Sequence, residues 1–230
     1  MDLGFQRARQ PAQKEQRRTH LLTTARELLA GGVGLRALSL NELARHAEMA
    51  KANVYRYFES REALLLALLW EEWQEWFEAL QAGWPSGQRG PTKQDAVIAL
   101  LARSLARRTL LCELTAALPT VLEQNLGEAA IGDFKRESLA FFGTIARFLA
   151  ERAPALSEAA YAELLHDAAH AIMGLYPSLN PSPAAARALE APDLSFFRRD
   201  FRVELERVLG ALAADHARRS ERRAPRRRAR

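Results

Sequence analysis

The chain of 230 residues carries a formal net charge of +5, and its 48% hydrophobic and 27% charged residues are an ordinary balance for a globular protein. The single cysteine, Cys112, excludes an intrachain disulfide framework and gives no sign of a zinc site. The longest apolar run, Ala63–Trp70, is too short to span a bilayer, and the polar first twenty residues contain no signal peptide, so we expect a cytoplasmic protein.

Charge is distributed unevenly along the chain. Residues 1–61 carry a net charge of +5, residues 62–217 carry −7, and residues 218–230 carry +7. A basic segment at 1–61 followed by an acidic segment at 62–217 indicates that the basic segment binds a polyanion and the acidic segment does not. We expect the arginine-rich tail to be disordered, as a solvated end or as an aid to non-specific attraction of that polyanion.

Hydrophobic spacing predicts three helices in the first sixty residues. The first runs from Lys14 to Ala30 and ends at a group of glycines. A capping box from Ser39 to Glu42 opens the second, and a tight connection leads to a third short helix over 50–58. Two short helices joined by a tight turn are a common unit for reading DNA.

The third of these helices presents polar residues on its outer face. Val54 and Phe58 face inward, so Ala52 and Arg56 point the opposite way, with Asn53 beside them. Arg56 has two donors for a guanine edge, and Asn53 can pair with adenine or bind a phosphate. A three-helix bundle with a charged face is the alternative that the pattern alone leaves open.

Residues from about Arg17 to Trp76 resemble the N-terminal domain of the TetR (tetracycline repressor) family of bacterial regulators. The resemblance is carried by Ser39-Leu40-Asn41-Glu42-Leu43-Ala44, by Ala47-Glu48-Met49-Ala50-Lys51-Ala52-Asn53-Val54-Tyr55-Arg56-Tyr57-Phe58 and by Ser60-Arg61-Glu62-Ala63-Leu64. Glu48 replaces a turn glycine and Ala50 replaces a serine of the family pattern. We therefore expect Glu48 to hold a backbone conformation that glycine adopts more easily, and position 50 to lack a helix cap or phosphate contact.

The resemblance implies an all-α chain with a helix-turn-helix DNA-binding domain over 1–60, a larger helical ligand-binding and dimerisation domain over 61–217, and the tail over 218–230. It implies that the residues facing bases are Lys51, Ala52, Asn53 and Arg56. It implies that the residues holding phosphates are Ser39, Tyr55, Tyr57 and Arg61. It further implies a homodimer, formed through the last two long helices, that binds double-stranded DNA with an inverted repeat.

The remainder of the chain also has helical periodicity. The predicted helices cover residues 60–81, 94–108, 111–118, 128–152, 157–175 and 193–216. A linker at 83–91, a loop at 176–192 and a stop or kink at Pro119 separate them. Because aromatic residues are dense on the first and fourth of these helices, we expect a pocket for a small apolar or aromatic effector, with plain core packing as the alternative for the tryptophans. The expected lining is Trp73, Phe77, Leu105, Cys112 and Phe142, and we expect the Cys112 thiol to be buried and inert.

The helix predicted at 193–216 has an apolar stripe formed by Phe197, Phe201, Leu205, Val208 and Leu212. Because such a stripe at the chain end needs a covering surface, we expect a homodimer through 157–175 and 193–216, with packing inside the monomer as the alternative.

His166 and His170 stand four residues apart, with Asp167 between them, a spacing that can bind a metal. Since no third ligand is evident and the surroundings are apolar, we expect neither a metal site nor a cofactor.

The sequence contains no nucleophile elbow, dinucleotide-binding fingerprint or complete phosphate-binding loop, so we do not expect an enzyme. We expect a sequence-specific transcriptional repressor that leaves its operator when the effector binds. A regulator of the same family that activates transcription, or that answers to a protein partner, is the alternative. A helical enzyme built around His166, Asp167 and His170 is a distant third.

Overall fold

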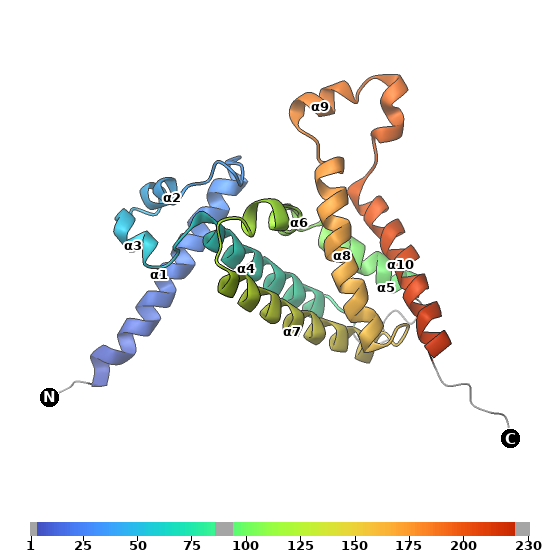
Figure 1. Ribbon diagram of the computed structural model, residues 1–230, viewed down its shortest axis with the longest axis horizontal. Helices are drawn as coiled ribbons and strands as arrows, with labels where there is room; N and C mark the ends of the chain where they lie inside the picture. The colour runs from blue at the N-terminus through green and yellow to red at the C-terminus, as the bar shows by residue number, and fades with distance from the viewer. Residues whose placement is uncertain (1–3, 86–93, 224–230) are drawn as a thin grey trace. The chain divides into compact units, whose positions relative to one another are not determined.

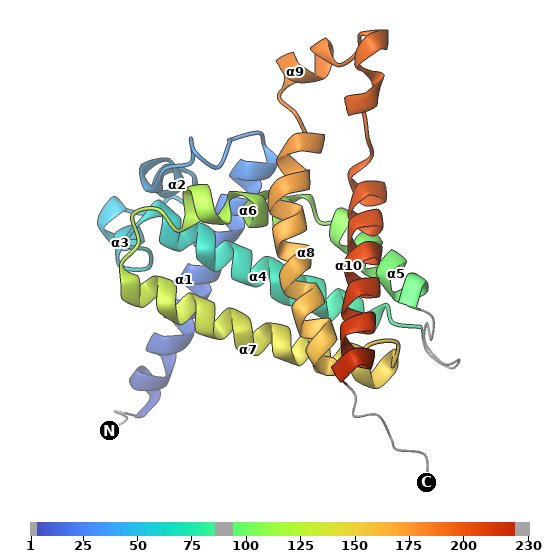
Figure 2. The same ribbon diagram turned by 45° about the vertical axis from the view of Figure 1, so that its right-hand side comes forward.

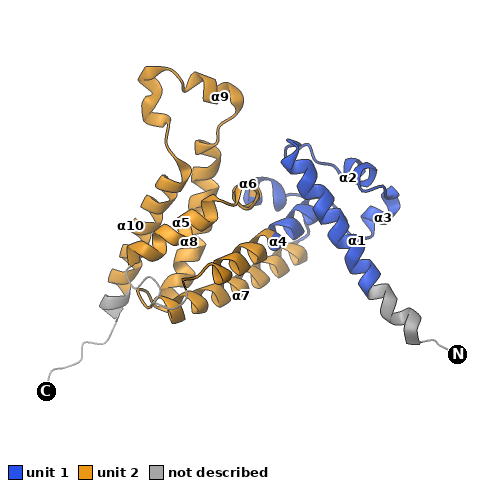
Figure 3. Ribbon diagram, turned by 180° about the vertical axis from the view of Figure 1, so that it is seen from behind, with its two compact units in different colours: residues 1–71, 118–127 blue, residues 72–117, 128–230 orange. Residues whose placement is uncertain are grey.

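The computed structural model describes residues 4–85 and 94–223, and the side chains over 12–85 and 94–219. Within these ranges every regular element is helical and no strand occurs, which confirms the all-α prediction (Figure 1). The chain forms two compact units, coloured separately in Figure 3. Unit 1 comprises Met1–Glu71 with Leu118–Gly127, and unit 2 comprises Glu72–Ala117 with Glu128–Arg230.

Unit 1 contains α1 (Gly4–Ala30), α2 (Leu40–His46), α3 (Lys51–Tyr55), the first half of α4 (Arg61–Ala82) and a π-helical turn, η1 (Leu118–Leu122). The first helix begins well before the predicted Lys14. It ends as expected at glycines, where Gly32 adopts a φ of +94° that a side chain would resist. The core of this unit is apolar, with Leu21, Leu22 and Leu43 fully buried.

Unit 2 contains the rest of α4, α5 (Gln94–Ala106), α6 (Thr109–Ala117), α7 (Glu128–Arg152), α8 (Glu158–Leu179), α9 (Pro183–Ala188), a 3₁₀ helix η2 (Pro192–Phe197) and α10 (Phe201–Arg223). The central element is α8, which packs against α6, α7 and α10, while α10 also packs against α5 (Figure 2). The α-helix stops before Pro119, as expected, because α6 ends at Ala117, but helical backbone continues through Pro119 as the π-helical turn, which ends at Leu122.

The predicted apolar stripe on the last helix is only partly correct. Phe197 lies in η2, and α10 begins at Phe201, where the Asp200 side chain accepts a hydrogen bond from the amide of Val203. Leu205 is fully buried, and α10 packs on α5 and α8 of the same chain. This part of the stripe is therefore covered within the monomer, the alternative that the pattern had left open.

Two expectations about the connecting segments were wrong. The loop predicted from Tyr176 begins only after Leu179, because α8 runs through Pro177. Proline removes a single backbone donor, and the hydroxyl of Ser178 donates to the carbonyl of Gly174 over 2.8 Å in the same turn. The first residues of the tail expected to be disordered from residue 218 continue α10 as far as Arg223, and the rest of that tail, 224–230, lies outside the described residues.

The segment between α8 and α10 forms a projecting arm, which we define as residues 182–198. Figures 1 and 2 show the arm extending beyond the rest of unit 2. Neither α9 nor η2 contains a buried residue. The described helices also include none that is long and apolar enough to cross a membrane.

Candidate nucleic-acid interface

The second helix is anchored by its cap. The Ser39 hydroxyl accepts a 3.1 Å hydrogen bond from the amide of Glu42, which is one half of the predicted capping box. At the other end, ring atom Nε2 of His20 lies 3.2 Å from the carbonyl oxygen of Ala47, within hydrogen-bonding distance. The cap fixes the start of α2, and the contact from His20 of α1 holds its end and so helps to position the turn that follows.

The turn between α2 and α3 has the backbone conformation expected from the sequence. Glu48 has a φ of +53°, in the left-handed region where glycine is least strained. The amide of Met49 donates to the carbonyl of Ala44 over 2.9 Å and closes the turn. At the start of α3, Ala50 provides no side-chain cap, as expected from the missing serine.

The third helix is shorter than predicted, because it ends at Tyr55 instead of reaching Phe58. Its last turn tightens as the amides of Arg56 and Tyr57 bond the carbonyls three residues back, at 3.2 and 2.9 Å. Val54 and Phe58 are buried as predicted, and this fixes which face points outward.

The predicted base-facing residues gather on that outward face. Lys51, Ala52 and Arg56 are exposed and Asn53 is half-buried. Of the predicted phosphate contacts, Tyr55 is 50% exposed and Tyr57 is half-buried. This helix and the two residues that follow it thus carry two cations, an amide and two phenols.

A groove of about 390 Å³ runs beside this face in unit 1. One wall is formed by Asn53, Arg56 and Tyr57, and the other by Gln13, Lys14 and Arg17 of α1. Nothing in the sequence marks these α1 residues as part of the same surface. Their charge contributes to the basic segment at 1–61, but only the fold places them beside α3.

Arg61 has partners within its own unit. Its guanidinium donates to the backbone carbonyl of Arg36 over 2.8 Å and to the carboxylate of Glu62 over 2.5 Å. Burial raises the pKa of Glu62, but hydrogen bonds from its own amide and from Arg61 outweigh burial and leave that pKa below its usual value. Arg61 therefore ties the start of α4 to the loop before α2, and its contact with phosphate stays a prediction.

Unit 2 contains a small, partly open cavity of about 30 Å³. Three of the predicted effector residues line it, namely Trp73, Leu105 and Phe142. The cavity is otherwise mainly apolar, but the Thr115 hydroxyl in its wall is buried and has no hydrogen-bond partner among the described residues. This volume admits only about one or two water molecules, whereas pockets for drug-sized ligands occupy roughly 300–1,000 Å³.

The other two predicted effector residues do not line this cavity. Phe77 packs edge-on against the rings of Phe141 and Phe148. Cys112 is fully buried, and its thiol donates to the carbonyl of Leu105 over 3.3 Å. Burial raises the pKa of Cys112 to about 12, so the thiol stays protonated at neutral pH.

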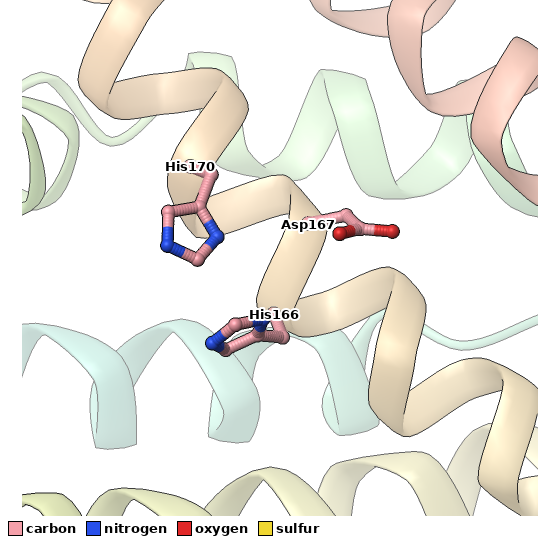
Figure 4. Close-up of side chains that lie close together, drawn as sticks. All are labelled: His166, Asp167 and His170. Carbon is pink, nitrogen blue, oxygen red and sulfur yellow. The ribbon is translucent and has the colours of Figure 1, made fainter.

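His166, Asp167 and His170 place potential metal-ligating atoms within 4.8 Å of one another on α8. Figure 4 shows both imidazole rings on one side of the helix and the Asp167 carboxylate on another. That carboxylate lies 2.7 Å from Nε2 of His216 on α10 and so already has a partner. The geometry permits a metal ion, and the expectation that none binds stays a prediction.

Comparison with known families gives two matches that together cover most of the chain. A family model described as "Bacterial regulatory proteins, tetR family" matches residues 21–68. A second, described as "Tetracyclin repressor-like, C-terminal domain", matches residues 70–214. No protein with curated annotation matches the chain.

Solved structures add a likeness of fold. A TetR variant from Acinetobacter baumannii AYE, crystallised with minocycline, has 19% identity and a TM-score of 0.52, over 86% of this chain and 94% of that one. GusR from Salmonella enterica has 16% identity and a TM-score of 0.47, over 86% and 96% of the two chains. At these identities the first likeness concerns the fold alone.

Proposed function

Because this chain belongs to the tetR family of bacterial regulatory proteins, we propose that it is a homodimeric repressor that binds an inverted-repeat operator and leaves it when a small apolar or aromatic molecule binds unit 2. Membership of the family makes the chain a DNA-binding transcription regulator. The direction of regulation, the effector and the roles of individual residues belong to the proposal.

The outward face of α3 supports the proposed DNA contacts. Arg56 and Asn53 offer the donors that recognise guanine and adenine edges, and they share a groove with Lys14 and Arg17, whose charges suit phosphates. Base contacts are assigned to Lys51, Ala52, Asn53 and Arg56. Phosphate contacts are assigned to Ser39, Tyr55, Tyr57 and Arg61, with Lys14 and Arg17 added from the structure.

The interior cavity supports an apolar effector. Its lining is aromatic and aliphatic, and the unpartnered Thr115 hydroxyl offers one hydrogen bond to a polar group of the ligand. At about 30 Å³ the cavity is too small for such a ligand, so effector binding requires a conformation in which it is enlarged. The effector can release DNA only if that enlarged conformation is also the one that binds DNA less well.

We place the dimer interface on α8, α10 and the arm. Phe196 and Phe197, in η2 of the arm, are 69% and 58% exposed. A six-residue helix with no buried side chain is not stable by itself, and exposed neighbouring phenylalanines favour a covering surface. A second copy of the chain would supply that surface.

Selection of bound sequences from a random DNA library tests the first half of the proposal. We expect one enriched inverted repeat, bound by two chains with an affinity that falls steeply as salt rises. Enrichment of a single half-site by a protein that sediments as a monomer would contradict the proposed assembly.

Release of the operator DNA by an added compound tests the second half of the proposal. Apolar and aromatic compounds are titrated into the protein–DNA complex, and the fraction bound is followed by fluorescence anisotropy of labelled DNA. We expect some compounds to lower operator affinity about 5- to 150-fold, the usual range of coupling between two sites. If a protein partner or an activating signal governs the regulator instead, no such compound will release the DNA.

A further inference from the structure

A second, larger hollow in unit 2 lies between α4 and α5. This groove has a volume of about 470 Å³ and is distinct from the small cavity described above. Its apolar floor includes Trp76 and Leu80 of α4 and Leu100 of α5. Trp76 and Leu80 are buried, and the indole N–H of Trp76 already donates to the Ser104 hydroxyl, so the ring offers the groove an apolar surface.

Three arginines line the same groove: Arg103, Arg107 and Arg108. Arg108 already has partners on α4, because its guanidinium donates to the carboxylate of Glu75 over 3.1 Å and to the carbonyl of Glu75 over 2.9 Å. Arg103 and Arg107 are exposed, and neither forms an ion pair with any residue in the described ranges 12–85 and 94–219. Two cations four residues apart therefore share the groove without a counterion from those ranges.

Arg103 and Arg107 lie in the acidic part of the chain. Residues 62–217 carry a net charge of −7, so an arginine there has many acidic side chains available as partners. Two arginines left without one repel each other at four-residue spacing, and an anion between them would relieve that repulsion. Because the neighbouring floor of the groove is apolar, the ligand must also have a hydrophobic part.

We propose that this groove binds an amphipathic organic anion. An aromatic body lies against Trp76 and Leu80, and its carboxylate accepts hydrogen bonds from Arg103 and Arg107. Trp76 lines both this groove and the small cavity, so an occupant of the groove contacts a side chain that also borders the cavity. The binding site stands independently of the proposed function, whereas the identification of its occupant as the effector rests on that function.

Calorimetric titration of the full chain with 1-naphthoate tests the binding site, with the neutral 1-naphthamide as the matched probe. We expect one naphthoate per chain, bound about tenfold more tightly than the amide because two charge-assisted hydrogen bonds depend on the carboxylate. Equal affinity for the two probes, or no binding of naphthoate at millimolar concentration, would overturn the proposal.

Variants locate the site. Arg103→Gln and Arg107→Gln keep most of the side-chain stem and remove the charge, so each should weaken naphthoate binding about tenfold and leave naphthamide binding unchanged. Ala79→Phe fills the groove from α4 and should block both probes. Arg187→Gln, on the exposed α9, is the control and should change neither. Wild-type affinity for naphthoate in both groove-arginine variants would refute the assignment.

The same probe separates this inference from the proposed function. Naphthoate that binds in the groove and also lowers operator affinity identifies the groove as an effector site. If naphthoate binds and the operator stays bound, the effector role of the groove is refuted while its anion site is confirmed. If apolar compounds release DNA and naphthoate does not bind, the proposed function survives and the anion site is refuted.

Discussion

The indole nitrogen of Trp76 donates a 3.0 Å hydrogen bond to the hydroxyl of Ser104, and that hydroxyl donates in turn to the carbonyl of Leu101 over 2.9 Å. The pair joins α4 to α5 at the point where the outer groove and the inner cavity share a side chain. Since Trp76 is only 4% exposed, its N–H depends on Ser104 for a partner.

Ser104→Ala should lower the free energy of unfolding by about 1–3 kcal/mol, because it leaves the buried indole N–H unsatisfied. Trp76→Phe removes the same donor, so the double variant should lose less than the sum of the two single losses. Urea unfolding of the four proteins measures this coupling. Strict additivity would show that the hydrogen bond contributes nothing to stability. Ser195→Ala, at an exposed serine, is the control.

Arg56→Ala and Arg17→Ala should have different effects on DNA binding. Arg56 lies on the outward face of α3, so its loss should cost about 1–3 kcal/mol and relax preference at one base position. Arg17 lies on the α1 side of the groove, so its loss should weaken all sequences alike and reduce the salt slope by about one unit. Binding curves on the selected operator and on one-base variants, at several salt concentrations, measure both effects. Sequence-independent losses for both variants would contradict the assignment of Arg56.

Arg61→Ala should destabilise unit 1 as well as weaken DNA binding. Glu62 is 5% exposed and would lose its ion-pair partner, so we expect a loss of about 1–3 kcal/mol in stability. The hydrogen bonds to Arg36 and Glu62 use only part of the guanidinium, and the remaining N–H groups can still meet a phosphate. A fall in the salt slope of about one unit would support that contact. Unchanged stability would contradict the structural role, and an unchanged slope would contradict the phosphate contact.

Cys112 should resist thiol reagents in the folded protein. With its pKa raised to about 12 by burial, only about one thiol in 10,000 is ionised at pH 8, and the thiolate is the reactive form. We expect 5,5′-dithiobis(2-nitrobenzoic acid) to react slowly with the native chain and to titrate one thiol per chain in guanidinium chloride. Full reaction of the native protein within minutes would show that Cys112 is accessible.

Replacing Phe196 and Phe197 together with serine should weaken the dimer. Both rings are exposed in the single chain, so we expect the fold to tolerate the change while the dimer dissociation constant rises about tenfold or more. Sedimentation equilibrium measures that constant. Leu139→Ser is the control, because Leu139 is 75% exposed on α7 of the same unit. An arm that does not contact the second copy would leave the dissociation constant unchanged.

Elements that depend on near neighbours in sequence were predictable. The cap at Ser39, the strained turn at Glu48 and the end of α6 before Pro119 follow from side chains acting on backbone within a few residues. The long helices α4 and α7 have bounds within one residue of those predicted, because their apolar spacing repeats over many turns. The predicted base-facing residues share one outward face because Val54 and Phe58 are buried opposite them.

What depends on distant contacts was decided by the tertiary structure. Helical spacing shows that a helix has an apolar face, but the long-range packing of other elements decides what covers that face. For this reason the pattern could not show that Leu205 packs inside its own chain, or that Lys14 and Arg17 lie beside Arg56. Likewise, the residues next to an arginine in the sequence do not show which group its guanidinium will contact. Only the fold directs Arg61 to the carbonyl of Arg36 and leaves Arg103 in a groove without one among the described residues.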